Sequence, residues 1–307
     1  NLQTGLGSGP YKIVDADYGV RYRLTKHNDW HGEGAYFDEL DYQVINDPNA
    51  RQTALITGDV DAVSQLDLKT IDLLKRDPNI EIDDVPSAAA ITMPMLTDTA
   101  PFDNNDVRMA LKYSIDRQEM IDKIAYGYPT IGNDFHHSPA MPYWPDNITQ
   151  TPYDPDKAKS LLKEAGISNA KLTFYVTQGG SGMLDPVAMG TAIQADLAAV
   201  GFDVEIKTFE WNAFLGEVNP GLEGKADMAE MAWMTNDPDT LPYLALRTSA
   251  WPDQGGFNSG YYSNPKVDEL LEAARSSTDQ NERASLYKEM QEIVQEDAPW
   301  VFVANWK

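Results

Sequence analysis

Hydrophobic and polar positions follow two different periods in the second half of the chain. Residues Asp154–Gly166 place apolar side chains on one face with helical spacing, and Pro186–Val200 repeats that pattern. On either side of the second helix, Leu172–Val176 and Phe202–Ile206 alternate as strands. The order strand, helix, strand predicts a βαβ unit whose two strands are parallel.

The N-terminal part of the chain predicts short elements in which strands dominate. Tyr11–Val14 and Val20–Leu24 flank a turn and predict a hairpin. Asp47-Pro48 predicts a helix start, because aspartate caps a first turn and proline is favoured at the first helical position, and Gly58 predicts the end of that helix. The other expected elements are strands at Leu40–Ile45, Val60–Ala62, Ile80–Val85 and Ala89–Met95 and a helix at Asp67–Leu74.

Helices become more frequent after Pro101. Asp103 and Asp106 precede an apolar repeat and predict a capped helix that ends near Gly127. Asn264-Pro265 predicts a further helix start in the same way. The chain then continues with a helix at Glu282–Gln295 and an apolar strand at Val301–Ala304. The whole pattern predicts an α/β fold.

The segment Ala226–Asp239 (ADMAEMAWMTNDPD) is the most informative part of the chain for function. It predicts an apolar strand that ends in Trp233 and breaks into a polar turn containing Asp237 and Asp239. An aromatic ring and a carboxylate at the end of one strand are a common wall of a small-molecule site. Glu230 lies inside the apolar stretch, where a carboxylate needs a cation, a hydrogen-bond donor or water.

Composition narrows the function classes. The 307 residues include 24 basic and 48 acidic ones, a net charge of −24, and no cysteine. Nucleic-acid binding is not expected, because neutralising phosphates needs clusters of Lys and Arg. Disulfides, thiolate metal sites and cysteine nucleophiles are excluded. No apolar run approaches the ~20 residues that span a bilayer.

Two other kinds of site are weaker alternatives. Glu230 with Asp237 or Asp239 would supply a carboxylate pair for glycoside hydrolysis, and abundant Trp and Tyr would suit sugars, which makes a secreted carbohydrate-active enzyme the second hypothesis. His136 and His137 are adjacent in an extended loop, so their side chains would point to opposite sides. We expect no metal and no cofactor there, although a metal-chelate receptor would have to use this pair.

The segment Gly179–Gly182 (GGSG) follows a predicted strand and precedes a predicted helix, where a backbone can approach a ligand closely. It lacks the Lys-Ser/Thr of a phosphate-binding loop. Gly180 is therefore a candidate contact, and a flexible connection is the alternative.

Several segments, taken in order, carry a resemblance to a known family. They are GSGPYK (Gly7–Lys12), RQTALITGDVDA (Arg51–Ala62), PFDNNDVRMALKYSIDRQEMI (Pro101–Ile121), YDPDKAKSLLKEAG (Tyr153–Gly166), Ala226–Asp239, YYSNPKVDELLEAAR (Tyr261–Arg275) and RASLYKEMQEIVQEDAP (Arg283–Pro299). The chain resembles the family 5 extracellular solute-binding proteins, the dipeptide/oligopeptide-type receptors of bacterial ABC importers.

The resemblance implies a two-lobed periplasmic-binding-protein architecture of the clam-shell type II, with mixed sheets. Residues 1–96 would form part of lobe I, residues 97–297 lobe II, and residues 298–307 a strand that returns to lobe I. The chain would be a fragment that lacks the N-terminal part and the C-terminal tail of the family.

The resemblance also implies a peptide ligand and the residues that hold it. Trp233 would touch the ligand and Asp237 would hold its α-ammonium, with Asn236 as the competing alignment. Two departures favour a non-peptide solute (a nickel chelate, an opine or a sugar) as the alternative: the turn after Trp233 is short, and Glu230 stands where some members have a cation. The full set of expected ligand-binding residues is Trp233, Asp237, Asn236, Glu230, Met231, Met234, Thr235 and Gly180.

The function implied is capture of a small solute, foremost a di- or oligopeptide, and its delivery to the permease subunits of an ABC transporter. Such a protein is a receptor and not an enzyme. It would be a monomer in the periplasm, or outside the cell on a lipid anchor, and would meet the membrane only through its permease or that anchor.

Overall fold

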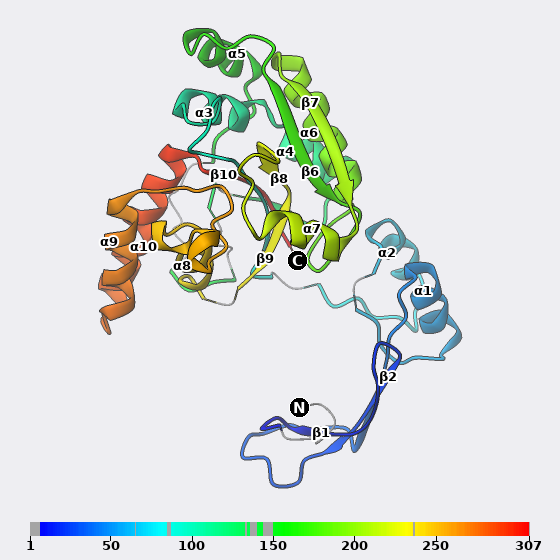
Figure 1. Cartoon of the computed structure of the whole chain (residues 1–307). Coiled ribbons are helices and arrows are strands. Elements are labelled where there is room, and N and C mark those ends of the chain that lie inside the picture. The colour runs from blue at the N-terminus through cyan, green and yellow to red at the C-terminus, as the bar shows by residue number, and fades with distance from the viewer. Residues whose placement is uncertain are drawn as a thin grey trace. The chain divides into compact units, whose positions relative to one another are not determined.

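A computed structural model describes residues 7–64, 66–84, 87–132, 134–135, 140–143, 150–235 and 237–306. The chain divides into two compact units, residues 1–82 and residues 83–307. Figure 1 shows the helices and strands of both units with their labels.

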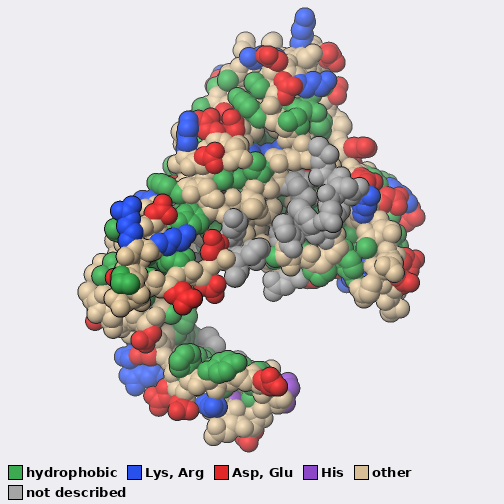
Figure 2. Space-filling view, turned by 180° about the vertical axis from the view of Figure 1, so that it is seen from behind, with side chains coloured by type: hydrophobic (Ala, Val, Ile, Leu, Met, Phe, Trp, Pro, Cys, Tyr) green, Lys and Arg blue, Asp and Glu red, His purple; other side chains and the backbone are tan. Residues whose placement is uncertain are grey.

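The first unit contains an antiparallel sheet in the order β1 (Tyr11–Asp17), β2 (Arg21–Lys26), β3 (Glu39–Gln43). The predicted hairpin is confirmed; β1 continues to Asp17, beyond the expected Val14, and contains a register shift between Ile13 and Asp15. None of the residues in these three strands is buried. Hydrophobic side chains therefore lie at the surface of this sheet (Figure 2).

Two helices complete the first unit, α1 (Pro48–Thr57) and α2 (Leu68–Leu74), and both predictions are confirmed. Asp47 caps α1, and Gly58 ends it in the left-handed conformation, with φ 76°. The strand expected at Val60–Ala62 is wrong, because the Val60 N–H donates to the carbonyl of Ala54 and completes the helix cap. The strand expected at Ile80–Val85 is also wrong over residues 80–84, which pair with no strand; residue 85 lies outside the described residues.

The second unit contains two sheets of different kinds. One is antiparallel, in the order β5 (Thr130–Ile131), β10 (Trp300–Asn305), β4 (Ala89–Pro94), β9 (Met231–Met234). The other is parallel, in the order β7 (Asp203–Phe209), β6 (Lys171–Thr177), β8 (Met228–Ala229). Helix α6 (Pro186–Val200) connects β6 to β7, so the predicted βαβ unit and the α/β class are confirmed (Figure 1).

The single apolar strand expected around Trp233 is divided between these two sheets. Up to Ala229 the chain pairs with β6, and the Glu230 N–H still donates to the carbonyl of Tyr175 in that strand. From Met231 onward the chain pairs with β4. Glu230 is thus the residue at which the chain passes from one sheet to the other.

One long helix expected between Asp103 and Gly127 is wrong, because the structure has α3 (Asn105–Ser114) and α4 (Arg117–Lys123). Asn104 caps α3 in place of the expected aspartates. Asp116 caps α4 by accepting from the backbone N–H of Glu119, and this second cap stops the first helix.

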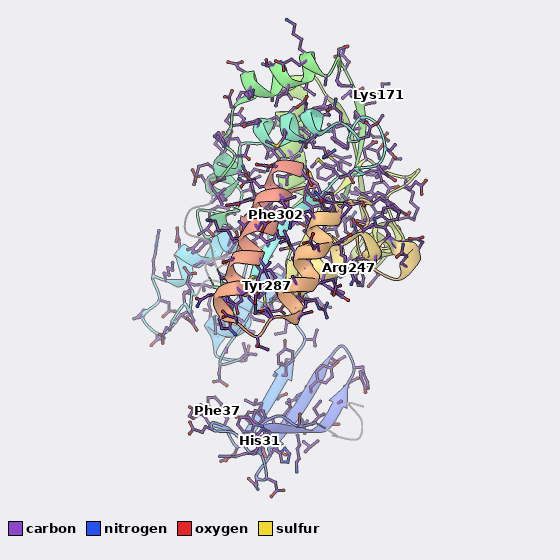
Figure 3. The ribbon with its side chains drawn as sticks, turned by 90° about the vertical axis from the view of Figure 1, so that its left-hand side faces the viewer. His31, Phe37, Lys171, Arg247, Tyr287 and Phe302 are labelled. Carbon is purple, nitrogen blue, oxygen red and sulfur yellow. The ribbon has the colours of Figure 1, made fainter. Side chains whose placement is uncertain are left out.

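The remaining helices are α5 (Pro155–Glu164), α7 (Trp211–Val218), α8 (Thr240–Ala245), α9 (Pro265–Ser276) and α10 (Gln280–Asp297), with short 3-10 turns at Thr248–Ala250 and Pro252–Gln254. Of these helices, α5 and α9 begin at the predicted Asp-Pro and Asn-Pro starts, α10 begins two residues before the expected Glu282, and α7 and α8 were not expected. Figure 3 shows α9 and α10 side by side, with Tyr287 on α10 and Phe302 on β10, and both side chains belong to one buried cluster. Across the described residues, every helix is too short or too polar to cross a membrane.

A buried ionic network joins α3 and α4 to the loop that contains Asp134. Lys112 and Arg117 both pair with the Asp134 carboxylate, at 3.6 and 2.7 Å, and all three side chains are at most 2% exposed. Burial lowers the pKa of Lys112 to about 8 despite the nearby carboxylate. Burial would raise the pKa of Asp134, but the charges of the two cations outweigh it and the pKa is lowered. The Thr151 N–H also donates to Asp134, at 2.6 Å.

Candidate functional site

The carboxyl ends of β6, β7 and β9 define the candidate site. Strands β6 and β7 are parallel, and the chain that forms β9 leaves the parallel sheet in the same direction, next to β6. Ligands of α/β proteins bind outside the carboxyl ends of such strands, where loops replace hydrogen-bonded backbone. The loop after β6, the start of α7 and the turn after β9 are therefore the segments that can line a binding surface.

Contacts hold the loop after β6 in place. A Cβ atom on Gly180 would lie 2.3 Å from Cε3 of Trp211, so only glycine allows that ring to lie on the backbone. The Trp306 Nε1–H donates to the carbonyl of Gly182 at 2.8 Å. A Cβ atom on Gly182 would lie 3.0 Å from that of Ala232 in β9. The predicted ligand contact Gly180 therefore lies in a packed loop beside the end of β9.

The end of β9 changes from buried to exposed within a few residues. Met234 is 65% exposed, and its Sδ would lie 3.8 Å from a Cβ atom on Gly182. Thr235, by contrast, is 8% exposed. The expected contact Asn236 lies outside the described residues. Met234 is thus the predicted site residue that most clearly presents its side chain to solvent at this edge.

Trp233 is packed against other aromatic rings. Its ring stacks on Trp300 with centroids 6.4 Å apart and meets Phe257 edge-on at 6.0 Å. Phe257 is itself 41% exposed, so this aromatic group extends from the core to the surface. Met231 is only 9% exposed and lies in the neighbouring core cluster. Trp233 and Met231, which were both expected to contact the ligand, therefore also stabilise the fold.

Asp237 has a local structural role. Its carboxylate accepts hydrogen bonds from the backbone N–H groups of Asp239 and Thr240, each at 2.9 Å, and from the Thr240 hydroxyl at 2.6 Å. Burial would raise the pKa of Asp237, but these hydrogen bonds outweigh it and lower the pKa. An ionised carboxylate has about four acceptor positions, so Asp237 keeps capacity for one more donor.

Glu230 is the most unusual side chain near the site. It is 1% exposed, and neither carboxyl oxygen has a hydrogen-bond partner. Burial raises the pKa of Glu230 well above its usual 4.5, and the negative charge of Asp185 raises it further. The side chain is therefore a neutral acid in the folded protein at pH values where an exposed glutamate is ionised.

Glu230→Gln is expected to stabilise the protein increasingly as pH rises above about 4.5, the ordinary pKa of glutamate. In that range the unfolded chain releases the Glu230 proton while the folded chain keeps it. The free energy of unfolding of the wild type therefore falls by up to about 1.4 kcal/mol for each pH unit, until the pH passes the pKa of Glu230 in the folded protein. Glutamine removes this linkage. Urea unfolding at pH 4.5, 6 and 7.5 measures the difference, and parallel pH profiles for the two proteins would contradict a protonated Glu230.

Two residues at this edge, Trp211 and Trp306, were not expected from the sequence. Trp211 begins α7 directly after β7, so the rule that selected Gly180, a position at the carboxyl end of a parallel strand, also applies to it. No local pattern indicated Trp306, whose contact with Gly182 depends on strand β10 returning from the far end of the chain.

Neither the cavity found in the structure nor the His, Asp and Glu side chains that it describes indicate a second binding site. A shallow cavity of about 420 Å³ lies at the opposite edge of the parallel sheet, where α5 and α6 end, and is lined by Lys159, Lys163, Asn169 and Gly201 among others. Among the residues that the structure describes, no group of three His, Asp or Glu side chains is arranged to hold a metal ion. The pair His136–His137 lies outside the described residues.

The α/β fold, with one parallel and one antiparallel sheet, is that of a solute-binding protein. A model of the bacterial extracellular solute-binding proteins, family 5 Middle, matches residues 2–255. The chain belongs to the bacterial extracellular solute-binding proteins of family 5.

Individual relatives agree with this assignment. The chain is 30% identical to Di/tripeptide-binding protein 2 of Pseudomonas aeruginosa, over 98% of this chain and 56% of that protein. It is also 30% identical to Heme-binding protein A of Haemophilus influenzae, over 98% of this chain and 54% of that protein. The chain therefore spans about half the length of these curated relatives.

A solved structure shows the same fold. The periplasmic binding protein DppA from Helicobacter pylori, in complex with peptide STSA, matches with a TM-score of 0.81 and 32% identity, over 97% of this chain and 57% of that one. The expected α/β architecture of the two-lobed periplasmic binding proteins is thereby confirmed.

Proposed function

We propose that the protein of which this chain is part captures a small peptide and delivers it to the permease of an ABC importer. The likeness to a solved peptide complex over 97% of the chain carries this proposal. The peptide-binding relative at 30% identity supports the same ligand class. Closure of two lobes around a ligand is the usual motion of such receptors, and a ligand drives it only by binding the closed state better.

We assign residues 1–96 to lobe I, residues 97–297 to lobe II and residues 298–307 to a strand that returns to lobe I. The pairing of β10 with β4 supports the returning strand. Strand β9 of the proposed lobe II also pairs with β4, so the connection between the lobes would pass through this sheet. The sheet β1–β3 exposes hydrophobic side chains. This agrees with a lobe in which further residues of the whole protein pack on the sheet.

The proposed ligand-binding surface consists of Gly180, Glu230, Met231, Trp233, Met234, Thr235, Asn236 and Asp237. Met234 and the loop containing Gly180 form the exposed part at the ends of the strands. The group acts by binding and not by catalysis, because Asp237 already holds the first turn of α8 and Glu230 has both oxygens buried.

The receptor would work in the periplasm, or outside the cell on a lipid anchor, as a monomer that docks on its permease subunits. The family of extracellular solute-binding proteins supports this location. The excess of 48 acidic over 24 basic residues favours a well-solvated surface and gives no support for nucleic acid as a partner.

Asp237→Asn is expected to weaken binding of a peptide with a free α-ammonium by about 10- to 100-fold, the scale of a hydrogen bond to a charged group. It should also lower the free energy of unfolding by about 1 kcal/mol, because the Asp237 carboxylate accepts three local hydrogen bonds that an amide oxygen accepts less strongly. Calorimetric titration and urea unfolding measure the two effects. Unchanged affinity with reduced stability would mean that Asp237 is only a cap.

Native mass spectrometry of the intact protein, purified without denaturation, tests the proposal. We expect bound peptides as a series of masses. A single non-peptide mass would move the solute to the alternative class of chelates, opines or sugars. A glycoside turned over by the protein, with activity lost in Glu230→Gln and Asp237→Asn, would overturn the receptor in favour of the enzyme.

A further inference from the structure

Tyr243, on helix α8, lies between two arginine side chains. The guanidinium carbon of Arg247 (labelled in Figure 3) is 3.6 Å from the centre of the Tyr243 ring, and that of Arg275 is 3.4 Å from it. Two guanidinium groups cannot share one face of a ring at these distances, so they lie on opposite faces. Each is attracted by the π-electrons of the ring. The ring is therefore held from both sides, by Arg247 just after α8 and by Arg275 in the last turn of α9.

Each arginine also pairs with a carboxylate, but the two carboxylates lie at different places. Nη1 of Arg275 lies 3.6 Å from Oδ2 of Asp239, the residue that directly precedes α8. Nη1 of Arg247 lies 3.1 Å from Oε1 of Glu272, within α9. Arg275 thus ties α9 to the start of α8, whereas Arg247 ties α9 to the chain that follows α8.

The start of α8 is also where the proposed partner of the ligand's α-ammonium lies. Asp237 accepts hydrogen bonds from the backbone N–H groups of Asp239 and Thr240, so its position depends on the path of the chain through these residues. Burial raises the pKa of Asp239, the positive charge of Arg275 opposes this increase, and the negative charge of Asp237 adds to it. The carboxylates of Asp237 and Asp239 therefore repel each other, and Arg275 offsets the repulsion.

The contact between Arg275 and Asp239 acts on position more than on stability. The two side chains are 39% and 21% exposed, and an ion pair that water can reach in this way contributes little to the free energy of unfolding. Helix α8 has only six residues, fewer than a helix needs to be stable by itself, so the contacts of its side chains determine where it lies.

We propose that Arg275 is a positioning residue for ligand binding: by holding the Tyr243 ring and the Asp239 carboxylate, it places Asp237 where the α-ammonium of the peptide binds. The inference rests on the proposed function and names a residue that acts through Asp237. Losing Arg275 cannot cost more affinity than losing Asp237 itself. We therefore expect the affinity for a peptide with a free α-ammonium to fall by about tenfold, the lower end of the range for Asp237→Asn.

Calorimetric titration of the intact protein with Ala-Ala-Ala and with its N-acetyl form tests this role. The acetylated peptide has no α-ammonium, so the ratio of the two affinities measures the contact with Asp237 separately from the rest of the binding surface. Arg275→Gln should reduce this ratio about tenfold, in line with the expected loss of the charged hydrogen bond. Arg275→Lys should keep most of it, because lysine keeps the positive charge that faces Asp239.

Arg247→Gln is the matched control. It removes the cation on the other face of the same ring and leaves the pair of Arg275 and Asp239 in place. The ratio of the two affinities should therefore stay as in the wild type. Urea unfolding of all three variants shows that each is folded and measures any loss of stability.

The possible outcomes separate this inference from the proposed function. An unchanged ratio in Arg275→Gln would overturn the role of Arg275, as would an equal fall in Arg247→Gln, which would assign the effect to the packing of α8. A glutamine variant at Arg275 that does not fold would make the residue structural and overturn its role too. A wild-type ratio near one would leave the peptide receptor and overturn the inference. If the wild type binds neither peptide, the proposed peptide receptor fails, and this inference fails with it.

Discussion

Asp134→Asn is expected to lower the free energy of unfolding of the second unit by about 3–5 kcal/mol, the scale for removing one partner of a buried ion pair. Asp134 is fully buried and is the carboxylate with which both Lys112 and Arg117 pair. Asparagine keeps the shape and the Thr151 contact but leaves two cations in the interior without their counter-charge. Urea unfolding followed by circular dichroism measures the loss.

Two control variants show whether charge is the cause. Lys112→Met removes the second cation and leaves the pair of Arg117 and Asp134 at 2.7 Å, so its loss should be much smaller. Glu119→Gln breaks the exposed pair with Lys123 and should change stability little. If Asp134→Asn lowered the free energy of unfolding no more than Glu119→Gln does, the buried ionic network would not stabilise the fold through its charges.

Trp233→Ala is expected to lower the free energy of unfolding by about 2 kcal/mol, less than the roughly 3–5 kcal/mol of a fully buried aromatic side chain, because the Trp233 ring is only partly buried. The ring stacks on Trp300 and meets Phe257 edge-on, so its removal leaves a gap between the sheet and the exposed aromatic group. Peptide affinity should fall as well, because Phe257 and the end of β9 lose their support. Thermal unfolding and calorimetric titration measure the two effects.

Met234→Ala is the matched variant on the adjacent residue. Its side chain is 65% exposed, so stability should stay within about 0.5 kcal/mol of the wild type. Peptide affinity should nevertheless fall, because Met234 lies at the edge where the solute is proposed to bind. Unchanged affinity in both variants would place the binding surface elsewhere on the protein.

The sequence was sufficient for elements whose signals are local. The caps Asp47, Asp154 and Asn264, each followed by proline, start their helices as predicted, since the side chain bonds to the first turn in every case. The break at Ile115 was missed although Asp116 and Glu119 form the same kind of cap, because the apolar repeat continues across it.

Features that depend on distant partners could not be predicted in this way. The sequence of Val60–Ala62 predicts a strand, but a strand has to pair with a neighbouring strand. The Val60 N–H instead donates to the Ala54 carbonyl in the cap of α1. The change of sheet at Glu230 depends on β6 and β4, which lie far away in sequence. The apolar segment around Glu230 indicated its burial, whereas the contact between Trp306 and Gly182 follows from the topology and has no signal in the sequence.

Thermal unfolding of the intact protein in the presence of a pool of di- to tetrapeptides tests whether the protein captures peptides. A ligand that binds only the folded state stabilises it by about 2.7 kcal/mol at a concentration one hundred times its Kd. We expect a concentration-dependent rise in Tm with peptides and a weaker response to free amino acids. An unchanged Tm at millimolar peptide, together with a rise for a sugar, an opine or a metal chelate, would contradict the peptide receptor.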